Sequence, residues 1–160
     1  MSEMIKMIVV DVDGTLTNGQ IMLMNVGGRI FEGKSFNAKD GMGITEWIRD
    51  GGIVSFISGR YCDTTKYRAK ELGVQEIHLG VNDKLDCLKK ICEKYKLLSD
   101  NVACIGDDVN DIGLYAFCHY SFAPADASDI NRMRASFVTH AKGGEGAVRE
   151  MIDILMGIKD

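Results

Sequence analysis

The stretch IVVDVDGTLTNG, residues 8–19, ends an apolar run of strand length with two carboxylates, Asp11 and Asp13. An unpaired charge at the end of a buried strand is costly, because the carboxylate loses its hydration. The two acids therefore mark either a solvated strand end or a site where something compensates their charge. The rest of the chain decides between these two interpretations.

Length and composition restrict the class of protein. The chain has 160 residues, which suffices for one hydrophobic core but not for two ordinary domains and a linker, so we expect one domain over residues 1–160. The formal net charge is −4 and the basic residues are scattered, which argues against a nucleic-acid partner. No apolar run reaches the roughly 18 residues of a membrane span, and the five cysteines form no C-x-x-C pair. We expect a cytoplasmic protein with reduced thiols and no membrane contact.

Apolar runs alternate with segments of helical period along most of the chain. This order predicts an α/β fold, a Rossmann-like parallel sheet sandwiched by crossover helices. The expected strands are Ile5–Val10, Ile53–Ile57, Glu76–Leu79, Val102–Ile105 and Phe137–Thr139. The expected helices carry Ile44, Trp47 and Ile48 before Gly51, Arg68 to Leu72 before Gly73, Asp83 to about Tyr95, and Val148, Ile152 and Leu155 before Gly157.

A segment at about residues 19–36 interrupts this alternation. Gln20–Met24 and Arg29–Phe36 flank a Gly27-Gly28 pair, and such a turn between two β-rich runs predicts an inserted hairpin. Ile21–Met24 has no polar face, so an exposed ribbon would aggregate unless something covered it. We expect contact with another subunit, and packing onto the parent domain is the alternative.

Polar residues follow four of the predicted strands, at the sheet edge where ligands gather in this class of fold. In chain order the groups are Asp11, Asp13, Gly14 and Thr15; Ser58, Gly59 and Arg60; Asn82, Asp83 and Lys84; and Gly106, Asp107, Asp108, Asn110 and Asp111. Clustered carboxylates repel one another unless a cation lies among them, and their hard oxygen ligands suit Mg²⁺. A hydroxyl, a lysine and helix N-termini would hold the oxygens of a phosphoryl group. A solvated acidic rim is the alternative.

Four of these stretches carry a family resemblance. DVDGTLTNG from Asp11, ISGR from Ile57, NDKL from Asn82 and IGDDVND from Ile105 resemble, in this order, the signature motifs of haloacid dehalogenase superfamily phosphatases. The resemblance implies Mg²⁺ dependence and an aspartyl-phosphate intermediate. The dehalogenases of the superfamily lack the second aspartate of the first motif, so Asp13 favours phosphate chemistry.

The resemblance also assigns roles to residues of this chain. Asp11 would be the nucleophile, Asp13 the general acid and base, and Ser58 and Lys84 the phosphate contacts. The metal would be held by Asp11, the backbone carbonyl of Asp13 and Asp107. Asp108 and Asp111 would orient metal-bound water.

Relatives with a lid domain insert it after the first motif or before the third. Here Thr15–Ile57 holds only the hairpin and one helix, and Gly73–Asp83 holds one short strand, which leaves no room for a lid. A neighbouring subunit reaching the site through the hairpin would exclude water instead.

The lidless arrangement, with FNAKDGMGI from Phe36, GRYCDTTKYRAKELG from Gly59 and KGGEGAVRE from Lys142, resembles the 3-deoxy-D-manno-octulosonate 8-phosphate phosphatase group and its nonulosonate 9-phosphate relatives. The resemblance implies a homotetramer and a sugar acid phosphate as substrate. The implied substrate contacts are Asp13, Asn37, Ala38, Lys39, Asp40, Gly41, Arg60, Arg68 and Lys84. Arg60 and Arg68, which we expect at one helix end, supply planar forks suited to a carboxylate.

Three alternatives stay open at this point. Glu145 stands where the octulosonate enzymes usually have arginine, a departure toward the nonulosonate 9-phosphate phosphatases, whereas Arg60 is octulosonate-like. A phosphoacceptor domain of the receiver type also combines acids, Mg²⁺, a hydroxyl and a lysine, but its acceptor aspartate lies on a middle strand. A non-catalytic assembly domain would not need every catalytic position filled.

Overall fold

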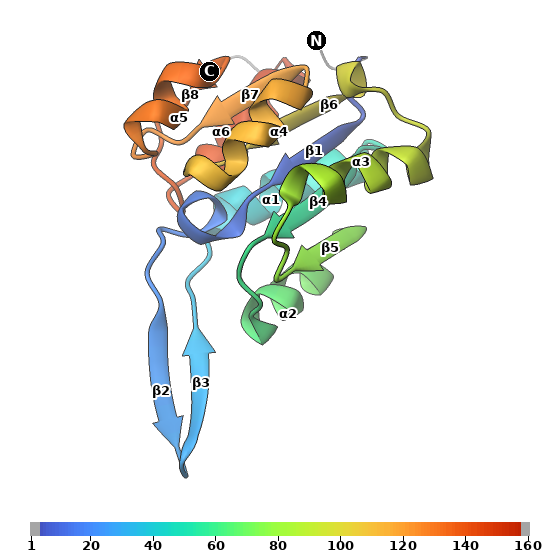
Figure 1. Cartoon of the computed structure of the whole chain (residues 1–160). Coiled ribbons are helices and arrows are strands. Elements are labelled where there is room, and N and C mark those ends of the chain that lie inside the picture. The colour runs from blue at the N-terminus through green and yellow to red at the C-terminus, as the bar shows by residue number, and fades with distance from the viewer. Residues whose placement is uncertain (1–3, 158–160) are drawn as a thin grey trace.

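The computed structural model describes residues 4–157, and its centre is a six-stranded sheet (Figure 1). The strands lie in the order β5-β4-β1-β6-β7-β8, and every neighbouring pair is parallel. The bounds are β1 (Met7–Val10), β4 (Ile53–Ser58), β5 (Glu76–Leu79), β6 (Val102–Ile105), β7 (Tyr120–Ala123) and β8 (Phe137–Val138). The strand that precedes Asp11, β1, is therefore central, between β4, which ends at Ser58, and β6, which precedes Asp107.

Helices cover both faces of the sheet, as the predicted fold class requires. Their bounds are α1 (Ala38–Arg49), α2 (Asp63–Leu72), α3 (Lys84–Tyr95), α4 (Ile112–Phe117), α5 (Asp129–Arg134) and α6 (Ala147–Met156). Three further elements are short helical turns: η1 (Val12–Leu16), η2 (Ser99–Asn101) and η3 (Val109–Asp111). Within residues 4–157, each helix falls short of the length and apolar character needed to cross a bilayer.

The sheet separates two hydrophobic cores because successive strand residues point to opposite faces. On β1, Ile8 and Val10 pack with α1, α2 and α6, whereas Met7 and Val9 pack with α3 and α4. All four side chains are fully buried. This two-sided burial is what makes β1 a continuous apolar run in the sequence.

The sequence prediction omitted β7, α4 and α5. The β7 strand contains the buried Ser121, whose hydroxyl and amide both bond to the exposed Ser136, so a buried polar residue interrupts its apolar pattern. The α5 helix has six residues and buries only Asn131, which leaves too short a pattern to recognise. The α1 helix also begins earlier than its apolar face suggested, because Gly41 and Gly43 occupy its first half.

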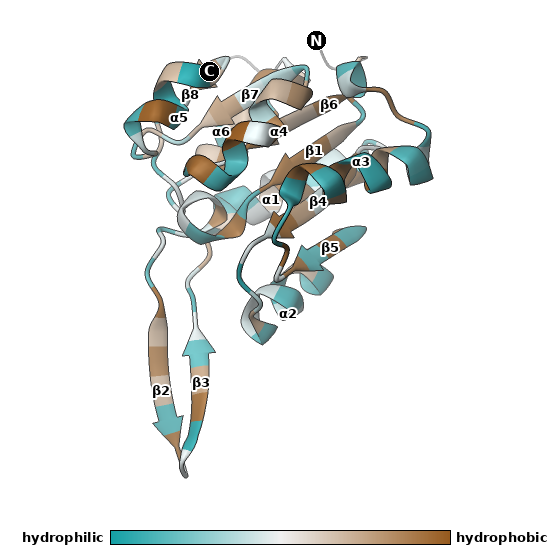
Figure 2. Cartoon of the chain, viewed as in Figure 1, coloured by the Kyte–Doolittle hydropathy of each residue, from teal (hydrophilic) through white to brown (hydrophobic). Residues whose placement is uncertain are grey.

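The predicted hairpin exists and stands away from the rest of the molecule (Figure 1). It consists of β2 (Met22–Val26) and β3 (Arg29–Gly33), joined by Gly27 and Gly28 with φ of 59° and 82°. Positive φ at both turn residues matches the right-handed twist of the arms. Every residue of β2 is exposed, and Figure 2 shows apolar residues along both arms. The alternative that the ribbon packs onto its own domain is therefore wrong.

Candidate active site

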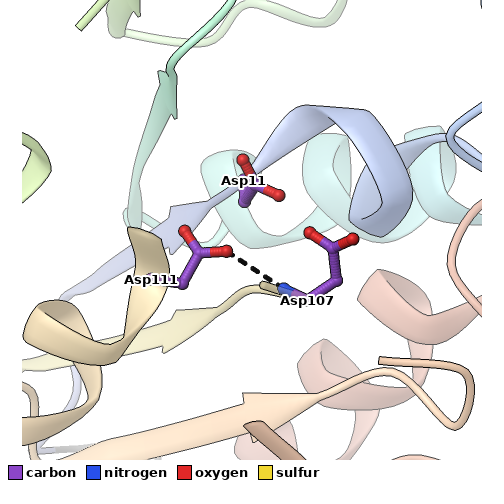
Figure 3. A group of neighbouring side chains, drawn as sticks. All are labelled: Asp11, Asp107 and Asp111. Atoms are coloured by element: carbon purple, nitrogen blue, oxygen red, sulfur yellow. Dashed lines mark hydrogen bonds between the residues drawn. The ribbon is translucent and has the colours of Figure 1, made fainter. Parts of the chain in front are cut away.

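Parallel pairing of β1 with β6 brings the first and fourth motifs together. The Asp11 amide donates to the Ile105 carbonyl at 3.1 Å, which continues the ladder into both loops. The Thr15 hydroxyl lies 3.1 Å from Asp11 Oδ2 and 3.3 Å from Asp107 Oδ1, so it bridges the two carboxylates. Oxygens of Asp11, Asp107 and Asp111 all lie within 4.8 Å of one another (Figure 3).

Gly14 makes this approach of the two loops possible. Its φ is +88°, and a Cβ atom there would lie 2.0 Å from Asp107 Oδ2. Any other residue would force the Asp107 carboxylate out of the cluster. The glycine of the DVDG stretch is thus required by the contact between the two motifs.

Lys84 links the third motif to the same cluster. It opens α3, and its Nζ lies 2.7 Å from Asp11 Oδ1 and 2.7 Å from Asp111 Oδ1. All three side chains are buried, with exposed fractions of 3% for Lys84, 5% for Asp11 and 0% for Asp111. A buried ammonium between two carboxylates satisfies charges that would otherwise be costly to bury.

The predicted water-orienting acids have different environments. Asp111 Oδ2 accepts the backbone amides of Asp107 and Asp108 at 3.0 and 3.3 Å, so this carboxylate shapes the loop that carries Asp107. Asp108 is exposed and its carboxylate accepts from the Val109 amide at 2.7 Å. Asp111 is therefore a buried support of the site, whereas Asp108 lies at its rim.

Burial and mutual repulsion raise the pKa values of the acids in the cluster. Burial raises the pKa of Asp11 to about 7, against the opposing effect of Lys84. Burial, followed by the Asp11 charge, raises the pKa of Asp111 to about 6, and burial also raises the pKa of Asp107. Burial alone would lower the pKa of Lys84, but Asp11 and Asp111 together raise it. The lysine is thus charged, and its single ammonium group faces a cluster of three carboxylates.

A pocket of about 490 Å³ opens in front of this cluster. Its lining residues are Asp11, Asp13, Ile21, Ser58, Gly59, Arg60, Asp107, Asp108, Val109 and Asn110. Ser58 ends β4, is 2% exposed, and accepts from the Arg60 amide at 3.3 Å. Residues after three separate strands thus line one pocket, as the sheet topology predicts.

Arg60 reaches this pocket but already has a carboxylate partner. Its Nε lies 3.0 Å from each carboxylate oxygen of Glu32, and its Nη2 also bonds to that carboxylate. The hydrogen bond from Arg60 lowers the pKa of Glu32 to about 2. The sequence analysis had not singled out Glu32, which lies on β3 at the base of the hairpin.

The predicted substrate contacts do not all lie in this pocket. Arg68 lies in the middle of α2 and lines a neighbouring pocket of about 350 Å³ with Ala38, so it shares neither a helix end nor a pocket with Arg60. The Arg68 guanidinium pairs with Glu71 and approaches Gly41, where a Cβ atom would lie 2.4 Å from its Nη2. This separation corrects the expectation that both arginines open onto one helix end.

The Asn37–Gly41 stretch is the start of α1. Asn37 caps the helix by accepting the Lys39 amide at 2.8 Å, and Lys39 itself is exposed. Asp40 is fully buried and accepts the Arg149 amide at 2.9 Å, at the start of α6. The fold thus uses the Asp40 carboxylate to hold α6, so the prediction of a substrate contact through this side chain needs correction.

The sequence analysis missed the local role of the KGGEGAVRE stretch. A Cβ atom at Gly143 would lie 1.9 Å from the Gly14 carbonyl oxygen, and one at Gly144 would lie 2.4 Å from the Asn18 amide. The Gly144 amide donates to Thr15 at 3.0 Å. These glycines allow the loop before α6 to pack closely against residues 14–18, which follow Asp13. Glu145 in the same loop is exposed.

The donor set suits a divalent cation. Asp11 and Asp107 offer hard oxygen ligands from adjacent strand ends, and their raised pKa values show that each carboxylate is destabilised by burial and by its neighbours. A cation beside them would relieve that repulsion. Lys84 bonds to Oδ1 of Asp11, whereas the Thr15 hydroxyl bonds to Oδ2, so the orientation of the Asp11 carboxylate is fixed from both sides.

Comparisons with known proteins agree with this geometry. The family model of haloacid dehalogenase-like hydrolases matches residues 76–152. The chain is 36% identical over 155 residues to the 3-deoxy-D-manno-octulosonate 8-phosphate phosphatase of Salmonella typhi, covering 97% of this chain and 81% of that protein.

Solved structures show the same fold. The 3-deoxy-D-manno-octulosonate 8-phosphate phosphatase of Yersinia pestis superposes with a TM-score of 0.91 at 36% identity, covering 95% of this chain and 80% of that one. The enzyme of the same name from Moraxella catarrhalis, in complex with magnesium, phosphate and KDO, gives a TM-score of 0.91 at 33% identity, covering 98% and 88% of the two chains.

Proposed function

The chain belongs to the haloacid dehalogenase-like hydrolases, and on that premise we propose that it is a Mg²⁺-dependent phosphatase of a sugar acid phosphate. The proposed substrate is 3-deoxy-D-manno-octulosonate 8-phosphate, after the substrate named for its relatives. The observation that carries the proposal is the buried Asp11, held between Lys84 and Thr15 at the floor of the pocket.

The proposed reaction has two steps. An Asp11 oxygen bonds to phosphorus while the bond from phosphorus to the sugar oxygen breaks, and Asp13 gives its proton to that oxygen. Asp13 then takes a proton from the water that attacks phosphorus, and the bond from phosphorus to Asp11 breaks. Inorganic phosphate leaves, and both aspartates return to their starting states.

The other predicted site residues bind and orient the substrate. Lys84 and the Ser58 hydroxyl hold the phosphoryl oxygens, and Asp111 keeps Lys84 and the Asp107 loop in place. Asp11, Asp107 and the Asp13 carbonyl are the residues that would hold Mg²⁺. When bound, Mg²⁺ supplies the positive charge that offsets repulsion between the carboxylate and the phosphate.

A homotetramer is the proposed assembly. The apolar arms of the hairpin are exposed, with Met22 61% and Leu23 65% accessible, and the hairpin stem lies beside the pocket through Ile21 and Glu32. Burying such a ribbon against neighbouring subunits would remove apolar surface from water and close the open pocket. Residues 37–39, Gly41 and Arg68 would then contact substrate only where subunits meet.

A substrate panel tests the activity. We expect phosphate release from octulosonate 8-phosphate to exceed that from neutral hexose phosphates by about 100-fold in kcat/KM, since a charged guanidinium lies in the pocket. The panel includes nonulosonate 9-phosphates because Glu145, which replaces the arginine usual in the octulosonate enzymes, makes the chain more similar at that position to the nonulosonate 9-phosphate phosphatases. A preference for hexose phosphates would contradict the proposal, and preference for a nonulosonate would move it to that substrate.

Mg²⁺ is expected to raise the melting temperature more at pH 8 than at pH 6. Folding raises the pKa of Asp11 from 3.8 to about 7, so the metal-free protein loses stability as pH rises between those values. The metal binds the ionised carboxylates, so below pH 7 it must displace protons and stabilises less. Thermal unfolding at both pH values, with Asp107→Asn as the variant lacking one ligand, measures the difference. Equal shifts at both pH values would contradict this assignment of the ligands.

A further inference from the structure

Lys34 lies just beyond β3, where the exposed hairpin rejoins the body of the protein. Its side chain is nevertheless fully shielded from solvent, with an exposed fraction of 0%. Its Nζ lies 2.6 Å from Asp13 Oδ1 and 3.6 Å from Glu32 Oε2. A lysine is almost never fully buried unless carboxylates compensate its charge, and here one of the two is the proposed proton-transfer group.

The hairpin stem that carries Lys34 is held in place by contacts of Glu32. Glu32 accepts from Arg60, and its backbone carbonyl accepts from the Thr64 hydroxyl at 2.7 Å. These contacts tie β3 to the start of α2. Lys34 therefore approaches Asp13 from a backbone that is anchored two residues earlier, which restricts where its ammonium group lies.

The two carboxylates of the first motif thus have one buried lysine each. Lys84 holds Asp11, the residue that bonds to phosphorus, and Lys34 holds Asp13. We propose that Lys34 is a positioning residue for the proton transfers made by Asp13, an inference that rests on the proposed phosphatase function. Lys34 does not line the pocket that contains Asp11, Ser58 and Asp107; it lines the neighbouring pocket with Arg68. Its nearest contact with a residue of the first pocket is the one with Asp13.

The geometry shows how this positioning operates. Asp13 Oδ1 and Lys34 Nζ are both buried and contact each other as an ion pair without a hydrogen bond, whereas the Asp13 side chain as a whole is 24% exposed and lines the pocket. Fixing Oδ1 leaves Oδ2 as the oxygen available to the leaving group. In the first step the proton on that oxygen moves to the sugar oxygen as the phosphorus bond breaks, and a small displacement of the carboxyl group impairs this transfer strongly.

The test uses leaving groups that differ in their need for a proton. We expect Lys34→Met to lower kcat about 100-fold on the sugar phosphate that the wild type turns over best, within the range for general acid catalysis, with little change in KM. With p-nitrophenyl phosphate, whose leaving group departs as an anion, the initial burst of nitrophenolate should slow less than tenfold. A purely structural role would slow both substrates equally, and that result would overturn the proposal.

Two further variants keep the test decisive. Lys94→Met is the matched control, because Lys94 pairs with the buried Glu76 at the start of β5, which is not one of the proposed site residues. It should leave both rates unchanged. Lys34→Arg retains the charge with altered geometry, so it should show the same dependence on the leaving group with a smaller loss, and it replaces Lys34→Met if that variant does not fold. A wild type inactive on all phosphomonoesters would instead refute the proposed function.

Discussion

Asp11→Asn is expected to lower Mg²⁺-dependent phosphate release by about 10⁴-fold or more, in the range that follows removal of a covalent nucleophile. The amide has nearly the same shape as the carboxylate, but it neither attacks phosphorus nor carries the charge that binds Lys84 and the metal. The buried strand end keeps its hydrogen bond from Asp11 N to Ile105, so fold and oligomeric state should persist.

Phosphate release, circular dichroism and sedimentation of the same preparation measure this result. Asp129→Asn is the matched control, because Asp129 begins α5, pairs with Arg132 and has a side chain that is 89% exposed. It should retain wild-type turnover. Full activity in Asp11→Asn would overturn the covalent mechanism, because the amide cannot form the bond to phosphorus.

Lysine at both Met22 and Met24 is expected to yield monomers with turnover reduced at least tenfold. Met22 and Met24 point to the same face of β2 as Phe31 on β3, because directly paired residues share a face. All three are exposed in the single chain, at 61%, 45% and 42%. Two ammonium groups would have to lose their hydration for that face to be buried against a neighbour.

Sedimentation velocity and steady-state kinetics on the double variant measure this effect. Met133→Lys is the matched control, since Met133 is 85% exposed on α5, far from the hairpin in sequence. That change should leave sedimentation and turnover unaltered. A hairpin variant that sediments like the wild type would count against assembly through the hairpin, and a fully active monomer would show that the pocket needs no neighbour.

Much of the fold was predictable because its signals are local. The strand that ends at Val10 is buried on both faces, so its apolar run is continuous, and the Gly27-Gly28 turn has no alternative to a tight bend. The β7 strand escaped prediction because its polar Ser121 is satisfied by Ser136, a partner that the sequence does not reveal. Its stability comes from pairing with β6 and β8.

The core of the candidate site was predictable for a topological reason. In a parallel sheet the residues after each strand meet at one edge, so Asp11, Ser58 and Asp107 could be grouped without coordinates. The contacts that hold these site residues in place could not be predicted in this way. Asp40 is an aspartate like Asp11 and Asp107, and it was also expected in the site. Its carboxylate instead accepts the Arg149 amide at the start of α6, because the packing of α1 against α6 decides which polar group it meets.

The sequence by itself determined five of the six sheet strands and four of the helices, the DVDG, ISGR, NDKL and IGDDVND motifs, and the presence of an apolar ribbon. Each is encoded within a few consecutive residues, whose side chains set the local preference of the backbone. Only the tertiary structure decided that the ribbon stands free of its own domain and that its stem delivers Lys34 to Asp13 and Glu32 to Arg60. Those ion pairs join distant segments, and their formation depends on where the folded backbone places each charge.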